Sequence, residues 1–408
     1  MARWLYCRAA TIPSTMPEAA VAIASYTAVS ALGSGNAAHR DALRAGRSGL
    51  VPNDYRAAGA PLPCWIGRVA GLEDDPPPDV DTRLHRLLAR ALRQDQFGED
   101  LARTLADCGA ARVALVLGTS TANIEQSEQA YRRLDDGHLP MDLRDPRLHH
   151  LHGPAEWLGA QTGIAGPAFT ISTACSASAK AFGLGAHLLR AGIADAVLVV
   201  GADSLCASTL HGFNALELVD ASPCRPFDVQ RAGLSIGEAA AMAILRHIDD
   251  APLAARLLAC GESSDAYHLS APHPQGTGAE RALRAALREC DLPPDAFDYV
   301  NLHGTASRQN DVIEAALIAR LLPRVLASST KGATGHTLGA AGALEAVITL
   351  LAMHSGCAPG TTGCIAPEPA IAAQLLRSPR STTLRHALSF SFGFGGSNAC
   401  LALACGVP

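Results

Sequence analysis

"AFTISTACSASAKAFGLGAHLLRAGIADAVLVVGAD", residues 168 to 203, is the stretch that decides the fold. The apolar run at its start predicts a strand, the small residues after it predict a tight turn and a helix, and "AVLVVGAD" predicts a second, buried strand. Strand, helix and strand in this order form a β-α-β unit. Cys175 falls at the junction between the first strand and the helix.

Cys175 is the strongest single candidate for chemistry. A thiol at a helix N-terminus feels the positive end of the helix dipole, so we expect a lowered pKa and a raised fraction of thiolate. The alternative is an inert buried cysteine, which is the usual state of a free cysteine. Position alone leaves both interpretations open.

The alternation of strands and helices extends outward from this unit. "RVALVLGTST" (112 to 121), "FDYVNLHGTAS", "VLASSTKGATGH" and "ALSFSFGFGGSNACLALA" predict further strands, and "DVIEAALIARLL" and "LGAAGALEAVITLLAM" predict helices. A polar Asp-Asp-Ala-Pro connector separates two similarly alternating parts. We therefore expect a duplicated α/β structure with halves at residues 18–250 and 251–408.

Two histidines follow strand-like runs in the same way that Cys175 does. His303 and His336 each lie just beyond the C-terminal end of a strand-like run, and ligands bind at that edge of open α/β sheets. These placements favour a joint Cys/His/His site. A zinc site of the same residues is the alternative, but it lacks the usual short spacing of the first ligand pair, and Lys331 would repel a cation.

Lys331 is unusual in this chain, because 31 of the 33 cationic residues are Arg and the other lysine is Lys180. A compact ammonium with three donors can act where a planar guanidinium cannot; chance is the alternative. "GFGGSN" (393 to 398) could bring backbone N–H groups close to a substrate oxygen, as an oxyanion hole requires, or it could be a glycine turn without function.

Composition sets broader limits. The chain has 408 residues, of which 48% are hydrophobic and 17% charged, and this favours a compact α/β enzyme. A net charge of -5 argues against nucleic acid as a partner. The 12 Cys form no C-x-x-C pair, which indicates free thiols in a reducing cytoplasm. No run approaches a membrane span, and Met1 and Met16 are both candidate starts.

From about Val21 to the C-terminus the sequence resembles the elongating β-ketoacyl-[acyl-carrier-protein] synthases. The matching motifs are "TACSASA", "CRPFDVQRAG", "SSDAYH", "HGTAS", "KGATGHTLGAAGALE" and "SFGFGGSN". The resemblance implies the thiolase fold, a five-layered α-β-α-β-α arrangement built from two similar halves, with the nucleophile in the first half and the histidines in the second. It also implies a decarboxylative Claisen condensation of an acyl group with malonyl-acyl carrier protein (ACP), giving a β-ketoacyl-ACP in fatty acid or polyketide biosynthesis.

The same resemblance implies a role for each matching residue. Cys175 corresponds to the acyl-accepting nucleophile, and His303 and His336 to the pair that polarises the malonyl thioester carbonyl. Lys331 and Glu345 correspond to the active-site lysine and its carboxylate. Phe394 corresponds to the gatekeeper whose backbone N–H forms the oxyanion hole with that of Cys175. Substrate-binding positions are Thr305, Ser307, Phe392 and Gly395, of which the two hydroxyls hold the pantetheine arm.

No cofactor and no metal are implied, since the substrates are carried on the phosphopantetheine of ACP. The family is cytoplasmic and usually dimeric. Segments such as "LDDGHLP" and "STACSASAKAF" resemble ketosynthases of aryl polyene pigment clusters, which act on conjugated chains and can pair with a chain-length-factor-like subunit. Homodimer and heterodimer both stay open. Asn310 and Ala239 stand where the family commonly has Gly, which affects local loops rather than the nucleophile.

Other interpretations account for fewer residues. A non-catalytic chain-length factor lacks the nucleophilic Cys, and a thiolase carries a second catalytic Cys where this chain reads "GFGGSN". A starter-unit synthase would have Asn at the position of His336. The sequence leaves the length, saturation and conjugation of the acyl chain open, and it does not identify the carrier-docking residues.

Overall fold

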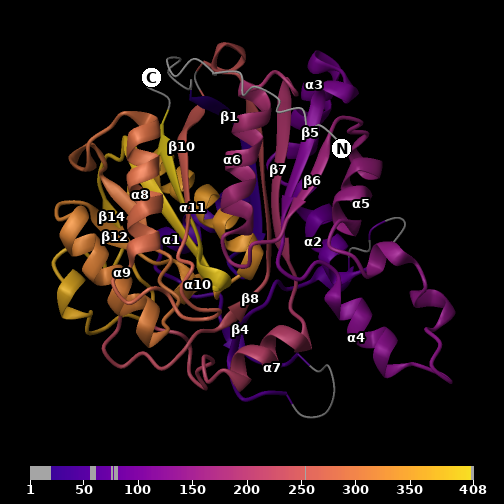
Figure 1. The fold of residues 1–408 in the computed structure, drawn as a ribbon, viewed down its shortest axis with the longest axis horizontal. Helices are drawn as coiled ribbons and strands as arrows, with labels where there is room; N and C mark the ends of the chain where they lie inside the picture. The colour runs from indigo at the N-terminus through magenta and orange to yellow at the C-terminus, as the bar shows by residue number, and fades with distance from the viewer. Residues whose placement is uncertain (1–19, 56–60, 75–76, 78–80, 253, 406–408) are drawn as a thin grey trace, which may run out of the picture.

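The computed structural model describes residues 20–405 except 56–60, 75–76, 78–80 and 253. Met16 and residues 18–19 of the expected first half lie outside the described residues. In the described chain an eleven-stranded sheet runs through the molecule (Figure 1). Ten strands lie in the order β12-β11-β15-β16-β10-β1-β9-β7-β5-β6, and β2 (Gly33–Ser34) pairs with β1.

The sheet has two halves that come from different parts of the chain. The N-terminal half-sheet consists of β1 (Val21–Ser30), β5 (Val113–Gly118), β6 (Ala168–Ile171), β7 (Ala196–Asp203) and β9 (Ala239–Arg246). The C-terminal half-sheet consists of β10 (Ala255–Ser264), β11 (Tyr299–Asn301), β12 (Leu326–Ser328), β15 (His386–Gly393) and β16 (Ser397–Ala404). Antiparallel pairing of β1 with β10, which sets Val21 opposite Leu257, joins the two halves.

The central strands β5, β7 and β9 are buried on both faces, which explains their continuous apolar runs. Side chains alternate between the faces, so Val197 and Val199 of β7 enter the core between the half-sheets, whereas Leu198 and Val200 enter an outer core. Alternating residues of β16 do the same in the C-terminal half-sheet. Each half-sheet therefore needs a helical layer on both sides.

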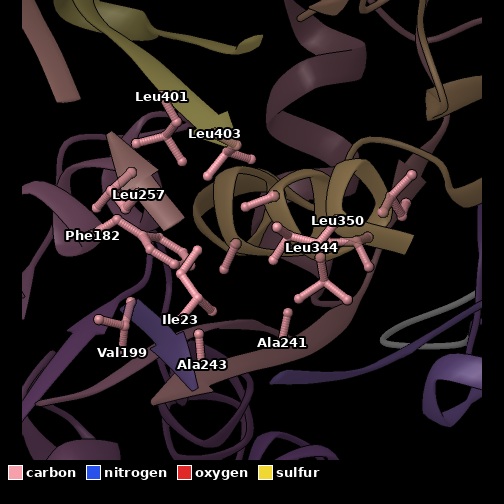
Figure 2. Packing of buried hydrophobic residues seen from close by; sticks show 14 of the residues in the cluster. Ile23, Phe182, Val199, Ala241, Ala243, Leu257, Leu344, Leu350, Leu401 and Leu403 are labelled. Carbon is pink, nitrogen blue, oxygen red and sulfur yellow. The ribbon is translucent and has the colours of Figure 1, made fainter. Parts of the chain in front are cut away.

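Two helices of small residues fill the space between the half-sheets: α6 (Ala177–Arg190) and α11 (Ala341–Ser355). A Cβ at Gly185 would lie 3.0 Å from Leu245 Cδ1 on one half-sheet, and a Cβ at Gly183 would lie 2.9 Å from Cys260 Sγ on the other. Figure 2 shows Phe182 of α6 and Leu344 and Leu350 of α11 among residues of strands from both halves. The small residues of α6 thus allow one helix to contact two half-sheets.

The outer helices complete the layers. One outer core contains residues of α2 (Arg83–Leu92), α3 (Phe97–Cys108) and α5 (Gly153–Thr162), and the other contains residues of α8 (Thr277–Cys290) and α9 (Arg308–Leu321). Figure 1 shows α8 and α9 on one side of the molecule and α3 and α5 on the other. The expected five-layered α-β-α-β-α fold is confirmed, with α6 and α11 as the middle layer.

The remaining elements are short or peripheral. The helices are α1 (Gly35–Arg44), α4 (Ile124–Arg132), α7 (Ala207–Ala215) and α10 (Lys331–Thr334). The short strands are β3 (Val51–Pro52), β4 (Trp65–Gly67), β8 (Ile236–Gly237), β13 (Cys357–Ala358) and β14 (Arg380–Ser381).

One stretch of the described residues, Leu338–Ser355, is long and apolar enough to cross a membrane by length and composition alone. The sequence contains no unbroken apolar run of this length, because Glu345 and His354 interrupt the stretch. The fold explains the composition, because 89% of the stretch is buried and most of it is the middle-layer helix α11. A helix covered on all sides is apolar around its whole circumference.

Candidate active site

Cys175 lies in the turn between β6 and α6, as the sequence predicts, and its side chain is buried. The residue before it, Ala174, has a φ of 52°, a left-handed conformation that non-glycine residues rarely adopt. The turn also touches the end of β15, where a Cβ at Gly393 would lie 2.6 Å from Thr173 O and 3.2 Å from Cys175 N. A glycine at 393 is what allows the "GFGG" segment to reach the cysteine.

Two histidines from the C-terminal half-sheet meet this cysteine. His336 Nε2 lies 2.9 Å from Cys175 Sγ, and the ring of His303 is perpendicular to that of His336 with 5.4 Å between centroids. The backbone of His336 is fixed on both sides, since its N–H donates to Ser235 O at 2.7 Å and its carbonyl accepts from Gly237 N at 2.9 Å. The predicted meeting of Cys175, His303 and His336 is present.

Lys331 lies behind the histidines rather than in contact with the cysteine. Its ammonium donates to the backbone carbonyl of His303 at 2.6 Å and to Glu345 Oε1, and both side chains are buried. Lys331 therefore holds the loop that carries His303 and places a positive charge close to the site. An arginine would be too large for this buried position between a carbonyl and a carboxylate.

The protonation state of the cysteine differs from the sequence-based prediction. Burial raises the pKa of the Cys175 thiol to about 12, and the charge of Lys331 opposes this only in part. The charge of Lys331 and the nearby amides are thus outweighed by desolvation, and the expected low pKa was wrong. In the resting protein Cys175 is a neutral thiol, so a base must accept its proton as it reacts.

The histidines are neutral as well. Burial lowers the pKa of His336 and of His303 well below the ordinary value, and the charge of Lys331 lowers both further. A neutral imidazole can accept a proton at one nitrogen or donate a hydrogen bond from it. Nδ1 of each ring has no hydrogen-bond partner among the described residues, whereas His336 Nε2 faces the thiol of Cys175.

A cavity of about 660 Å³ opens at these residues. Cys175, His303 and His336 line it together with the predicted substrate-binding residues Thr305, Ser307 and Phe392. Thr305 Oγ1 donates to Ser307 Oγ at 3.1 Å, so the two hydroxyls stand side by side on the wall. Gly395 does not line the cavity; its N–H donates to Leu269 O at 2.6 Å.

Phe394 also lines the cavity, and its ring stacks on Phe213 of α7 with 5.4 Å between centroids. The backbone amides of Phe394 and of Cys175 itself both lower the thiol pKa, which places the two predicted oxyanion donors beside the sulfur. This arrangement can stabilise negative charge on an oxygen bonded to the acylated carbon.

Two buried carboxylates near the site were not found from the sequence. Glu314 of α9 accepts the N–H of His303 at 2.7 Å and that of Gly304 at 2.8 Å, and burial raises its pKa to about 8. Asp203, at the end of β7, accepts hydrogen bonds from two loops next to the site. An acid within an otherwise apolar run, as in "DVIEAALIARLL", was the available signal for Glu314.

No group of three or more His, Cys, Asp or Glu in the described part of the chain is placed to hold a metal ion. The cysteine and its histidines are instead arranged for proton transfer and hydrogen bonding. A buried thiol with two neutral imidazoles, at the edge of a duplicated five-layered α/β fold, defines the thiolase-fold class of acyl-transferring enzymes.

Comparison with known proteins gives the family. Residues 90–251 match the model of the β-ketoacyl synthase N-terminal domain, and residues 254–364 match that of the C-terminal domain. The chain belongs to the β-ketoacyl synthase family, as its motifs indicated.

Relatives and a solved structure agree with this assignment. The chain is 35% identical over 298 residues to the mitochondrial 3-oxoacyl-[acyl-carrier-protein] synthase of Arabidopsis thaliana. The matched region covers 68% of this chain and 63% of that protein, which is less than two thirds of the length of the relative. The chain is 31% identical to 3-oxoacyl-[acyl-carrier-protein] synthase 2 of Vibrio cholerae, covering 74% and 78%. The ketosynthase ApeO, solved in complex with its chain length factor ApeC from Xenorhabdus doucetiae, has a TM-score of 0.85 and 33% identity, covering 95% of this chain and 98% of that one.

Proposed function

We propose that this chain is a 3-oxoacyl-[acyl-carrier-protein] synthase that condenses an acyl group on Cys175 with malonyl-ACP. The distance of 2.9 Å between Cys175 Sγ and His336 Nε2, inside a cavity that His303 also lines, carries the proposal. This arrangement places a nucleophile (Cys175), a base (His336) and a second hydrogen-bond donor (His303) in one cavity. No second cysteine lines this cavity in the described residues, which favours this reaction over that of a thiolase.

The first half-reaction transfers the acyl group. His336 takes the thiol proton as sulfur attacks the acyl-ACP thioester, the bond from the acyl carbon to the pantetheine sulfur breaks, and the proton passes to that sulfur. A neutral His336 can accept this proton, and a thiol with a raised pKa needs it removed. The backbone N–H groups of Cys175 and Phe394 stabilise the tetrahedral oxyanion.

The second half-reaction forms the carbon–carbon bond. The malonyl group loses carbon dioxide, and the electron pair of the broken bond passes into an enolate whose oxygen accepts hydrogen bonds from His303 and His336. The α-carbon attacks the acyl-Cys175 carbonyl, and the bond from that carbon to Sγ breaks as the β-ketoacyl-ACP forms. The departing thiolate takes a proton from solvent, which restores the neutral thiol. Burial and the charge of Lys331 keep both imidazole rings neutral, so neither ring has to lose a proton before it donates to the enolate. Lys331 also holds the backbone carbonyl of His303.

A chain-length-factor-like partner subunit is part of this proposal. Strand β6 lies at the end of the strand order with one neighbour, β5, and Phe169 on it is 40% exposed. An unpaired edge strand with an exposed aromatic side chain favours pairing with another chain. The likeness to ApeO, which was solved with its chain length factor, supports a heterodimer. The sequence motifs that resemble aryl polyene ketosynthases support a conjugated acyl substrate. Size-exclusion chromatography with light scattering of the chain alone, and of the chain co-expressed with such a subunit, distinguishes the two assemblies.

The reaction is tested by intact-protein mass spectrometry after mixing the chain, with and without a partner subunit, with a panel of acyl-ACP thioesters. We expect an acyl adduct on the wild type and on Cys108→Ala, which removes a partly exposed thiol elsewhere, but none on Cys175→Ala. Malonyl-ACP should then release the adduct as a longer β-ketoacyl product. If no acyl group transfers under any of these conditions, Cys175 is not the nucleophile and the non-catalytic subunit becomes the better interpretation.

A further inference from the structure

Asp203 is a buried carboxylate close to the site but outside the cavity. It is 0% exposed, and no Arg, Lys or His of the described residues forms an ion pair with it. A carboxylate buried without a cation is strongly unfavourable unless hydrogen-bond donors surround it. Its donors therefore show what the residue holds in place.

The donors come from two separate loops. Oδ1 accepts from Thr119 Oγ1 at 2.7 Å, Thr121 Oγ1 at 2.8 Å and Thr121 N at 2.9 Å, and Oδ2 accepts from Ser120 N at 2.9 Å. These residues form the loop after β5. Oδ2 also accepts from Gly339 N at 2.7 Å, which belongs to the loop after α10. One carboxylate thus joins two segments more than 200 residues apart in sequence.

Each of these loops is next to one of the reacting residues. Thr119 N donates to Ile171 O at 3.1 Å, so the first loop lies beside the strand that leads into Cys175. Gly339 follows His336 by three residues, and between them Leu338 has a φ of 53°, a strained conformation for a leucine. The bond from Asp203 to Gly339 holds this strained turn.

The two loops also touch each other. A Cβ at Gly339 would lie 2.4 Å from Ser120 N and 2.7 Å from Asp203 Oδ2. There is no space for the loops to approach further, and the shared carboxylate prevents them from separating. Their spacing is therefore set at Asp203.

From this geometry we propose that Asp203 is a positioning residue that sets the separation between Cys175 Sγ and His336 Nε2. It acts by binding the loop beside the cysteine and the loop after the histidine through the same carboxylate. This inference rests on the proposed function, in which His336 accepts the proton of Cys175.

The charge of Asp203 has a second effect on the same thiol. Among the charged groups near Cys175, Lys331 lowers the thiol pKa and Asp203 raises it, while the two histidines are neutral. Because a nearby negative charge disfavours thiolate, removing it lowers the thiol pKa. A residue with only a packing role would leave this pKa unchanged.

The test uses Asp203→Asn, whose amide has nearly the same shape but replaces an accepting oxygen with a donor. We expect the single-turnover rate of acylation by acyl-ACP to fall at least tenfold, because one loop loses its bond and the sulfur and nitrogen move apart. We also expect iodoacetamide to alkylate Cys175 about tenfold faster than in the wild type at each pH below the thiol pKa, because a pKa about one unit lower leaves about ten times as much thiolate. Asp298→Asn is the matched control, since Asp298 accepts the N–H groups of Arg385 and His386 far from the site.

A second variant covers the case in which Asp203→Asn does not fold. Thr121→Val keeps the side-chain volume and removes one donor to Oδ1. It should lower the acylation rate at saturating acyl-ACP about threefold or more and leave the half-saturating concentration unchanged, because Thr305 and Ser307 are intact. Wild-type acylation rates and an unchanged alkylation profile in a folded Asp203→Asn protein would overturn the inference. A wild-type chain that accepts no acyl group refutes the proposed function instead, and the alkylation profiles still decide whether Asp203 acts on the thiol.

Discussion

Gly393→Ala is expected to inactivate the protein through a single methyl group. The backbone at Gly393 has φ -104° and ψ 151°, which alanine adopts without strain, so only the space for the new Cβ matters. That Cβ would lie 2.6 Å from Thr173 O, about 0.8 Å inside the 3.4 Å at which ordinary contact begins, and 3.2 Å from Cys175 N. Both neighbours are backbone atoms and cannot rotate away, so β15 and the cysteine turn must separate by several tenths of an ångström.

The separation affects acylation more than stability. Overpacking of this kind costs about 1–3 kcal/mol of unfolding free energy. Moving the Phe394 N–H away from the oxyanion weakens one of its two hydrogen bonds. Loss of one such donor lowers the rate of acylation about 100-fold or more. We would measure the single-turnover rate of Cys175 acylation by quench and mass spectrometry, alongside the melting temperature. Gly159→Ala in α5 is the control, because its nearest neighbour, Ile164 O, is 3.7 Å away. If folded Gly393→Ala acylates within threefold of the wild type, the amide of Phe394 does not stabilise the oxyanion.

Two further substitutions test the electrostatics. Lys331→Arg and Lys331→Met should each lower decarboxylation of malonyl-ACP at least tenfold, because the guanidinium cannot occupy the buried space between the carbonyl of His303 and Glu345 and Met has no charge. Full activity of the Arg variant would show that charge alone suffices. Burial raises the pKa of Glu314 to about 8 from an ordinary 4.5. Between these two values the folded state keeps a proton that the unfolded state releases. Glu314 therefore lowers the free energy of unfolding as the pH rises from about 4.5 to 8. Glu314→Gln removes that dependence. The melting temperature of the variant minus that of the wild type should therefore be higher at pH 8 than at pH 5. The opposite trend in thermal scans would contradict the pKa shift.

The parts of the site that sequence could predict are those set by local order along the chain. Cys175, His303 and His336 each follow a strand-like run, and parallel strands bring such positions to one edge of a sheet. The same argument cannot predict a pKa, because the desolvation of Cys175 depends on packing from both half-sheets. Nor can it find Asp203, whose partners at Thr119 and Gly339 become neighbours only after the chain folds.

The fold was predictable for a similar reason. Continuous apolar runs and small-residue helices indicate strands and helices buried on both faces, and the family motifs supplied the five layers. Burial on all sides also explains why α11 has the length and apolar composition of a membrane-spanning helix. Only the tertiary contacts of α11 account for this composition. The pairing of β1 with β10 had no local signal, since neither strand contains a residue that specifies its partner.

The tight middle layer has a consequence for recombination between relatives. A Cβ at Gly342 of α11 would lie 2.5 Å from Ala179 N of α6, so the two helices touch backbone to backbone. A chimera that joins two parents between β9 and β10 takes α6 from one parent and α11 from the other. Such a hybrid places unmatched helices in contact directly behind Cys175, and a single extra methyl group there would disturb the nucleophile. Exchanging α6 and α11 together keeps this backbone contact matched, so such a hybrid should keep the geometry of the nucleophile.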